Sequence, residues 1–231
     1  TIALALKEAF EREGPWDVAT LLAMTPARCA AVFGQDPSLP LMHLFAQALN
    51  DYGRLLRTAY GGDPRRLVAS AEGSAERLVE RLTALAFYRD VAQYDGQPVA
   101  FYKRAQLAAA DLALALRQLT PPSPLGVFHD LDRLTIFADN LVPHVLRIDG
   151  ILEYAPALLA RITAEELIEP GSPEEVEIRA CAVHAVELLV AELRRQGHCV
   201  TAHQLDYLLW NRGQEPRYKA QPRHRARTVY Y

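Results

Sequence analysis

The fold class is clearest in residues 172–197, which read SPEEVEIRACAVHAVELLVAELRRQG. Ser172 and Glu175 fit the capping box that begins many helices, and Pro173 occupies the first helical position. Acidic residues come early and a pair of arginines comes late, as the helix macrodipole favours. Gly197 follows as a C-cap. This stretch therefore predicts one long α-helix.

Most of the remaining chain shows the same helical period. Apolar side chains recur every three to four residues, and turn or capping residues separate the runs. Further helix starts are expected at Thr163, with Glu166 completing a capping box, and just before Pro143. We expect other helices at residues 2–13, 26–33, 40–60, 74–86, 101–119 and 200–211. The predicted fold class is all-α, a compact multi-helix domain.

Residues 88–101 depart from this period. The dipeptide Asp95-Gly96 favours a type I′ turn, so one small β-hairpin is expected here. A lobe boundary is possible near residues 92–100, within what we otherwise predict to be a single domain over residues 1–231. Because the sequence begins without Met inside an amphipathic run, we expect that an N-terminal segment, and part of any pocket, lies upstream.

Composition narrows the function classes. The net charge of −3 gives no general electrostatic reason to bind nucleic acid or an anionic membrane. No apolar run is long enough to span a bilayer, and we expect no membrane partner. The three cysteines are an odd number without paired spacing, which argues against a disulfide framework and favours a reducing, cytoplasmic setting. No histidine has metal-ligand spacing and no nucleotide-cofactor motif occurs, so we predict neither a metal nor a cofactor.

Asp139 is the first candidate for chemistry. It follows the apolar run Ile136-Phe137-Ala138, and partial desolvation at such a place changes the proton affinity of a carboxyl group. The alternative is that Asp139 or Asn140 caps the following helix. A capping carboxylate can still face a ligand, so both interpretations stay open.

A second candidate is Lys103, which with Arg104 opens the most hydrophobic helix at the end where the dipole disfavours cations. Either an anionic ligand lies nearby, or the two side chains extend to solvent.

The third candidate lies on one helix. Asp206 and Trp210 share a face, and Tyr207 and Asn211 share the neighbouring face. A carboxylate, aromatic rings and an amide suit a flat polar heterocycle. Buried aromatics beside surface polar residues would give the same pattern.

The C-terminal segment is basic and ends in two tyrosines. It is either a solvated terminus, an RNA-contacting patch, or a segment that folds back over the core to bury its aromatic rings. Its cations are Arg212, Arg217, Lys219, Arg223, Arg225 and Arg227.

Six segments in order resemble the queuosine salvage protein family, the queuosine 5′-phosphate N-glycosylases/hydrolases. The similarity extends from near residue 3 to the last residue. The segments are YRDV (88–91), FYKRAQ (101–106), TIFADNLVP (135–143), EEVEIRA (174–180), LDYLLW (205–210) and HRARTVYY (224–231).

The resemblance implies a metal-free cytosolic hydrolase with an all-helical fold reminiscent of DNA glycosylases. It would cleave the N-glycosidic bond of queuosine 5′-phosphate and release queuine for tRNA modification, without a stable nucleic-acid partner. The family's F-A-D segment falls on Phe137 and Asp139, and its D-Y pair falls on Asp206 and Tyr207. Asn211 stands where we expect Asp. A pocket segment rich in aromatics and Asn, expected near the family's N-terminus, does not occur in this sequence.

These matches imply roles for the residues. Asp139 would lie below the ribose, as nucleophile or as electrostatic stabiliser of the positive charge that develops there. Queuine is a 7-deazaguanine without the N7 lone pair, so contacts must come from its guanine-like edge, for which Asp206 is the natural hydrogen-bond acceptor. Stacking would come from Phe137, Tyr207 or Trp210; Lys103, Arg227 and Tyr231 would hold the 5′-phosphate.

Two rivals remain. A non-enzymatic helical module that binds RNA or protein is the main alternative, and steep salt dependence would reveal RNA binding. A DNA-base glycosylase would need a positively charged surface along a duplex, which the net charge does not favour.

Overall fold

In the computed structural model, which describes residues 2–231, the chain divides into two compact units between Glu72 and Gly73. The first unit contains helices only. Met24, Phe33 and Met42 are central to its apolar core. The elements are α1 (Ile2–Glu13), α2 (Val18–Leu22), α3 (Pro26–Phe33), α4 (Pro40–Ala59) and α5 (Pro64–Ala69).

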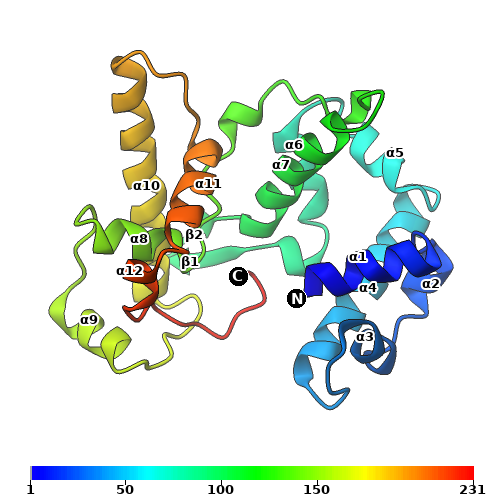
Figure 1. The fold of residues 1–231 in the computed structure, drawn as a ribbon, viewed down its shortest axis with the longest axis horizontal. Coiled ribbons are helices and arrows are strands. Elements are labelled where there is room, and N and C mark those ends of the chain that lie inside the picture. Colours follow the sequence, from blue (N-terminus) through cyan, green and yellow to red (C-terminus); the bar gives the residue numbers. More distant parts are fainter. Residues whose placement is uncertain (1) are drawn as a thin grey trace. The chain divides into compact units, whose positions relative to one another are not determined.

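The second unit, which ends at Tyr231, contains the remaining helices and one hairpin. Helix α8 packs against both α10 and α11 (Figure 1), and Val142, Leu146 and Val186 are fully buried there. The helices are α6 (Ala75–Leu82), α7 (Lys103–Arg117), α8 (Val142–Ile148), α9 (Pro156–Thr163), α10 (Pro173–Arg195), α11 (Ala202–Arg212) and α12 (Pro216–Lys219). The short 3-10 turns are η1 (Ala86–Tyr88), η2 (Pro124–Gly126) and η3 (Leu131–Arg133).

The long helix expected from the sequence is α10, and its ends are confirmed. The hydroxyl of Ser172 accepts a hydrogen bond from the backbone N–H of Glu175 at 3.3 Å. The helix ends at Arg195, and Gly197 adopts a φ of +88°, the left-handed conformation that glycine accepts without a steric penalty. The all-α fold class is confirmed with it.

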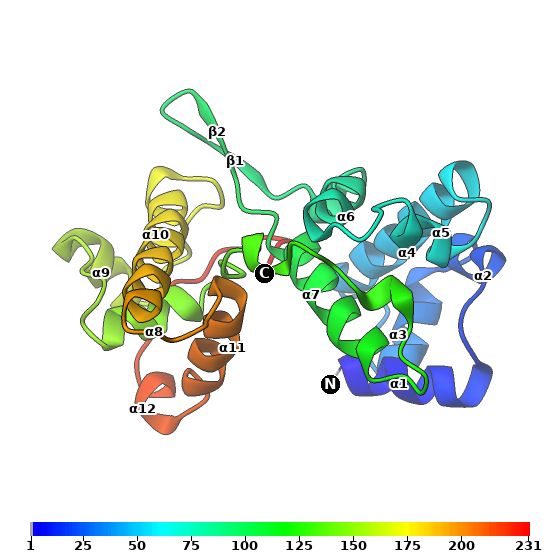
Figure 2. The ribbon, with the colours of Figure 1, turned by 90° about the horizontal axis from the view of Figure 1, so that it is seen from above.

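The predicted hairpin is also present, as β1 (Val91–Tyr94) and β2 (Gln97–Ala100). Asp95 and Gly96 have φ values of +50° and +75°, as a type I′ turn requires. The hairpin lies within the second unit, where β1 contacts α10 and the Tyr94 hydroxyl donates to Glu177; its turn projects outward (Figure 2).

The expectation of a helix start at Thr163 is wrong. Thr163 is the last residue of α9, and its hydroxyl donates to the carbonyl of Leu159 one turn earlier. The true start is Pro156, a first-turn proline after a loop. The spacing of Thr163 and Glu166 imitates a capping box. A Thr hydroxyl can also donate to the carbonyl four residues earlier in its own helix, so the residue alone does not distinguish a helix start from a helix end.

No helix within residues 2–231 is both long enough and apolar enough to cross a membrane.

Candidate active site

Asp139 lies in the loop between η3 and α8, and its two carboxylate oxygens face different partners. Oδ1 accepts hydrogen bonds from the backbone N–H groups of Leu141 at 2.7 Å and Val142 at 3.3 Å. Oδ2 lies 3.8 Å from Nζ of Lys103. Asp139 therefore fixes the turn into α8 with one oxygen and presents the other to a cation, so the two interpretations of this residue are compatible.

Helix α7 supplies one wall of the site. Lys103, Leu107 and Asp111 are spaced four residues apart, which places them along one face of the helix. The Lys103 side chain is only 14% exposed. It therefore does not extend freely into solvent, and it approaches the carboxylate of Asp139 instead.

Helix α11 supplies the opposing carboxylate, Asp206, which is 5% exposed. One of its oxygens accepts a hydrogen bond from the backbone N–H of Phe137 at 2.8 Å. Burial raises the pKa of Asp206 to about 7 and the charge of Asp139 adds to this effect, whereas the N–H of Phe137 and the cation of Lys103 oppose it. A carboxyl group with this pKa changes its charge near neutral pH.

Three further residues of α11 surround Asp206. The Tyr207 hydroxyl donates to Oδ1 of Asp111 at 2.9 Å, and its ring meets the Phe137 ring edge-on with centroids 6.4 Å apart. The Asn211 amide nitrogen donates to the Tyr207 carbonyl of its own helix, which leaves the amide oxygen as the acceptor. Trp210 is 44% exposed. These groups offer aromatic surface beside a small number of polar atoms.

A pocket of about 540 Å³ brings these side chains together. A volume of this size is ordinary for a small-molecule site. Seven of the residues singled out in the sequence line it, namely Lys103, Phe137, Asp139, Asp206, Tyr207, Trp210 and Asn211.

The sequence interpretation missed two lining residues, Leu107 and Asp111. The signal for Asp111 was available, because an acidic residue interrupts the most apolar helix eight residues, two turns, after Lys103.

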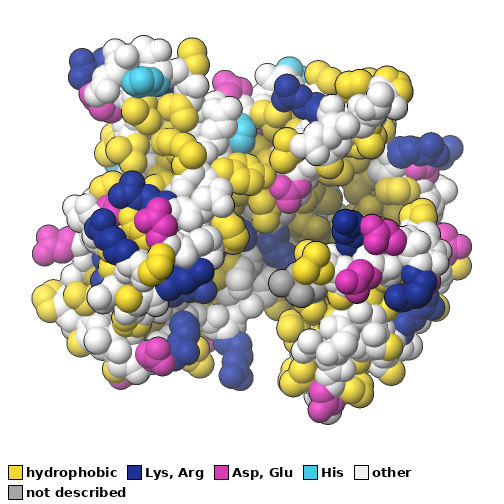
Figure 3. Space-filling view, viewed as in Figure 1, with side chains coloured by type: hydrophobic (Ala, Val, Ile, Leu, Met, Phe, Trp, Pro, Cys, Tyr) yellow, Lys and Arg dark blue, Asp and Glu magenta, His cyan; other side chains and the backbone are white. Residues whose placement is uncertain are grey.

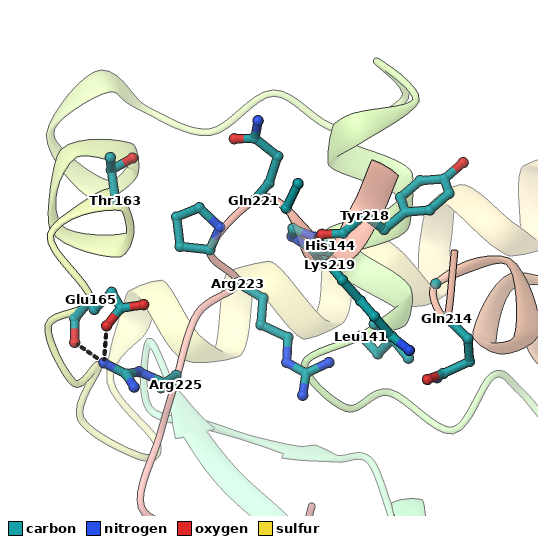
Figure 4. A pocket seen from close by; sticks show the side chains of 13 residues that line it. Leu141, His144, Thr163, Glu165, Gln214, Tyr218, Lys219, Gln221, Arg223 and Arg225 are labelled. Carbon is teal, nitrogen blue, oxygen red and sulfur yellow. Dashed lines mark hydrogen bonds and ion pairs between the residues drawn. The ribbon is translucent and has the colours of Figure 1, made fainter. Parts of the chain in front are cut away.

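A second pocket, of about 660 Å³, lies beside α8 and α12 (Figure 4). Lys219 and Arg223 extend into it, while Arg225 is bound to Glu165 through both the carbonyl and the side chain. The carboxylate of Glu165 is thus already paired with a cation. Because no other carboxylate lines this pocket, the smaller pocket is the better candidate for glycosidic chemistry.

The basic C-terminal segment folds back onto the second unit. Arg104 donates to the carbonyl of Val229 at 2.8 Å, and the hydroxyl of Tyr231 donates to Glu175 at 2.8 Å. Lys and Arg side chains gather around α12 on the molecular surface (Figure 3). Neither Arg227 nor Tyr231 lines the 540 Å³ pocket; their assignment to the 5′-phosphate stays a prediction.

This arrangement can stabilise a cation and bind a flat polar ring. Asp139 and Asp206 bring negative charge to a half-enclosed pocket, where electrostatic interactions are stronger than in water. Aromatic rings on two walls provide stacking surface. Within residues 2–231, no group of three His, Cys, Asp or Glu side chains is placed to hold a metal ion.

Comparison with known proteins gives the family. The profile of the queuosine salvage proteins matches residues 1–231. The chain belongs to this family.

Curated relatives carry a more specific name. A protein from Sphaerobacter thermophilus named queuosine 5′-phosphate N-glycosylase/hydrolase is 43% identical over 232 residues. Proteins of the same name from Dictyostelium discoideum and Mus musculus are 35% and 34% identical. The matches cover 100%, 94% and 87% of this chain, but only 71%, 66% and 62% of the three relatives. The sequence of this family member thus spans about two thirds of their length.

Proposed function

We propose that this protein hydrolyses the N-glycosidic bond of queuosine 5′-phosphate and releases queuine. The observation that carries the proposal is the meeting of Asp139, Lys103 and Asp206 with aromatic side chains in one pocket, in a chain whose relatives are named for this reaction.

In the proposed reaction, the bond between the ribose carbon C1′ and the base nitrogen breaks, and its electron pair leaves with the base. Positive charge develops on the ribose, and an anion beneath the ring lowers the barrier. Asp139 supplies this anion through Oδ2, because Oδ1 is held by the turn into α8. Water then adds to C1′ and provides the proton that the base takes up, which gives queuine and ribose 5-phosphate.

Asp206 and the aromatic residues bind the base. An ionised Asp206 accepts hydrogen bonds from the ring N–H and the exocyclic amine of the guanine-like edge. Phe137, Tyr207 or Trp210 stacks on the bicycle, and the free amide oxygen of Asn211 is a further acceptor.

The 5′-phosphate extends toward the start of α7. Lys103 lies there, and the Arg104–Val229 contact brings the C-terminal segment to the same place. Arg227 is exposed and has no ion-pair partner among the described residues. Lys219 and Arg223 are also exposed and unpaired among the described residues. Arg227, however, lies two residues before Val229, the residue that Arg104 holds, and this position favours it as the phosphate-binding cation.

The test is incubation of the purified protein with queuosine 5′-phosphate and, separately, queuosine, followed by chromatographic detection of free queuine. We expect release from the nucleotide. The matched variant is Asp139→Asn, which keeps an acceptor oxygen for Leu141 and Val142 but removes the charge. Losing one electrostatic stabiliser lowers rates about 10²- to 10³-fold, and we expect at least that loss with an unchanged circular dichroism spectrum.

Two results would contradict the proposal. One is the absence of queuine when the wild-type protein is in excess over substrate. The other is a well-folded Asp139→Asn variant that turns over within about tenfold of wild type, since a central anion supplies more than that.

A further inference from the structure

Helix α10 carries a buried arginine. Arg179 is 2% exposed, and its guanidinium contacts two buried carboxylates. It binds both oxygens of Asp90, with Nη1 3.0 Å from Oδ1, and it lies 3.2 Å from Oε1 of Glu175 on its own helix. A forked pair of this kind fixes orientation as well as charge. Arg179 thus ties η1 and the start of β1 to α10.

The same guanidinium also reaches the loop of the active site. Nε of Arg179 donates to the carbonyl of Ala138 at 2.9 Å. Ala138 immediately precedes Asp139 in the chain. A rigid group therefore holds the peptide that carries the proposed catalytic carboxylate.

Asp90 extends the connection to the other member of the charged pair. Its Oδ2 accepts a hydrogen bond from the backbone N–H of Lys103 at 3.3 Å, and its carbonyl accepts one from Phe101 at 2.9 Å. These bonds hold the first residues of α7. Arg179 is thereby linked to both residues that meet at 3.8 Å in the pocket, Lys103 through Asp90 and Asp139 through Ala138.

Two aromatic rings and the C-terminus complete this network. The guanidinium carbon of Arg179 lies 3.9 Å from the ring centre of Phe101 and 4.9 Å from that of Tyr231. The Tyr231 hydroxyl donates to the same Glu175 oxygen that Arg179 contacts. His224 is close by, but burial lowers its pKa to about 4 and leaves it neutral. Arg179 is therefore the cation that balances both carboxylates.

We propose that Arg179 is a positioning residue for the glycosidic reaction, which sets the distance between Lys103 and Asp139 and is held in place by Tyr231. The role deepens the proposed function and rests on it. Arg179 does not line the pocket, so it acts through Ala138 and Asp90 rather than on the substrate.

The position of α11 gives the inference a specific signature. Asp206 and Tyr207 belong to that helix, and neither has a hydrogen bond to Arg179 among the described residues; Asp206 contacts the loop one residue before Ala138, at the N–H of Phe137. Disturbing Arg179 should therefore displace Asp139 more than the base-binding residues of α11. Small misplacement of a catalytic group is known to reduce rates by about 10²-fold.

The first test is Arg179→Lys, which keeps the charge but loses the fork and the bond to Ala138. We expect kcat for queuosine 5′-phosphate to fall about tenfold or more, while the Kd for queuine, measured by calorimetry, stays within about twofold. Arg195→Lys is the matched control, because Arg195 lies on the same helix in an exposed pair with Glu192. An unchanged kcat in folded Arg179→Lys would overturn the inference.

A second variant separates positioning from stability. Asp90→Asn, Glu175→Gln and Arg179→Met together remove all three charges, and neutral replacement of a buried ionic group often preserves stability. If this triple variant unfolds like wild type but is inactive, positioning is supported; wild-type activity would overturn it.

The crystal structure of the triple variant gives a readout independent of substrate: the Lys103–Asp139 pair should have opened, and an unchanged pair would also overturn the inference. Absence of turnover by the wild-type protein would instead contradict the proposed function, while the structural readout still decides the role of Arg179.

Discussion

At Asp206, folding and ligand binding favour opposite charge states: burial favours the protonated carboxyl group, whereas binding of the base requires the ionised one. Its carboxyl group is buried with a single backbone donor, Phe137, and with the negative charge of Asp139 nearby. A base with two N–H donors would satisfy the ionised form that the empty pocket disfavours. The sequence predicted a ligand-facing acid here, but not its burial, because burial comes from the packing of α11 against the Phe137 loop.

The raised pKa makes stability depend on pH with a definite sign. The folded protein retains the Asp206 proton up to about pH 7, whereas the unfolded chain loses it near 3.8. The folded state therefore binds more protons between these values, and this group lowers the free energy of unfolding as pH rises through that window. The difference from 3.8 to about 7 corresponds to about 4 kcal/mol once complete.

We predict that Asp206→Asn removes this pH-dependent penalty. Relative to wild type, the variant should gain about 3 kcal/mol of unfolding free energy between pH 5 and pH 8, measured by urea unfolding at both pH values. Asp132→Asn, at an exposed carboxylate, is the control and should differ from wild type equally at the two pH values. A constant difference for Asp206→Asn would show that this carboxyl group titrates normally.

At the scale of elements, the sequence was most informative where one helix carried its own signals. The cap residue Ser172 and the terminal Gly197 defined α10, and the Asp95-Gly96 pair defined the hairpin. Short helices such as α12 were missed, because four residues show no period and are stabilised by packing. Likewise, the meeting of Asp111 with Tyr207 depends on how α7 and α11 are placed, which local sequence does not determine.

The Tyr207–Asp111 hydrogen bond joins the two helical walls of the pocket. We predict that Tyr207→Phe and Asp111→Ala each weaken queuine binding about three- to tenfold, and that the double variant is no weaker than the worse single one. Phenylalanine at position 207 preserves the edge contact with Phe137, so this double-mutant cycle measures the contribution of the hydroxyl alone. Calorimetric titration of all four proteins measures the coupling. If the fold-loss of queuine affinity in the double variant equals the product of the two single losses, the two residues act independently.

At the scale of the whole molecule, charge is distributed unevenly. The net charge is −3, yet the C-terminal segment is basic. Several of its cations make internal contacts, such as Arg225 with Glu165 and Arg212 with Asp149. The sequence left a free tail, an RNA patch and a folded-back segment open. The internal contacts favour the third, because a cation held by a carboxylate is less available to an RNA phosphate.

Arg227 is, with Lys219 and Arg223, one of the cations of this segment that have no ion pair among the described residues. Its role can be tested by comparing two substrates. It is exposed and unpaired among the described residues, two positions before the carbonyl that Arg104 holds. We predict that Arg227→Ala lowers kcat/KM for queuosine 5′-phosphate about tenfold, the loss of one charge-assisted hydrogen bond of about 1.4 kcal/mol. Activity on queuosine, which has no phosphate, should change less than about twofold by the same reasoning.

Arg225→Ala is the matched control for this comparison. Arg225 lies two residues away, carries the same charge and is engaged by Glu165 at 3.2 Å. If the phosphate contact is specific, this variant should leave the ratio of the two activities unchanged. If both variants reduce that ratio equally, the segment attracts the nucleotide only through its overall charge. The effect should then disappear in 0.5 M salt, where the Debye length is about 5 Å. If Arg227→Ala lowers both activities equally, the side chain supports the fold and does not contact the phosphate.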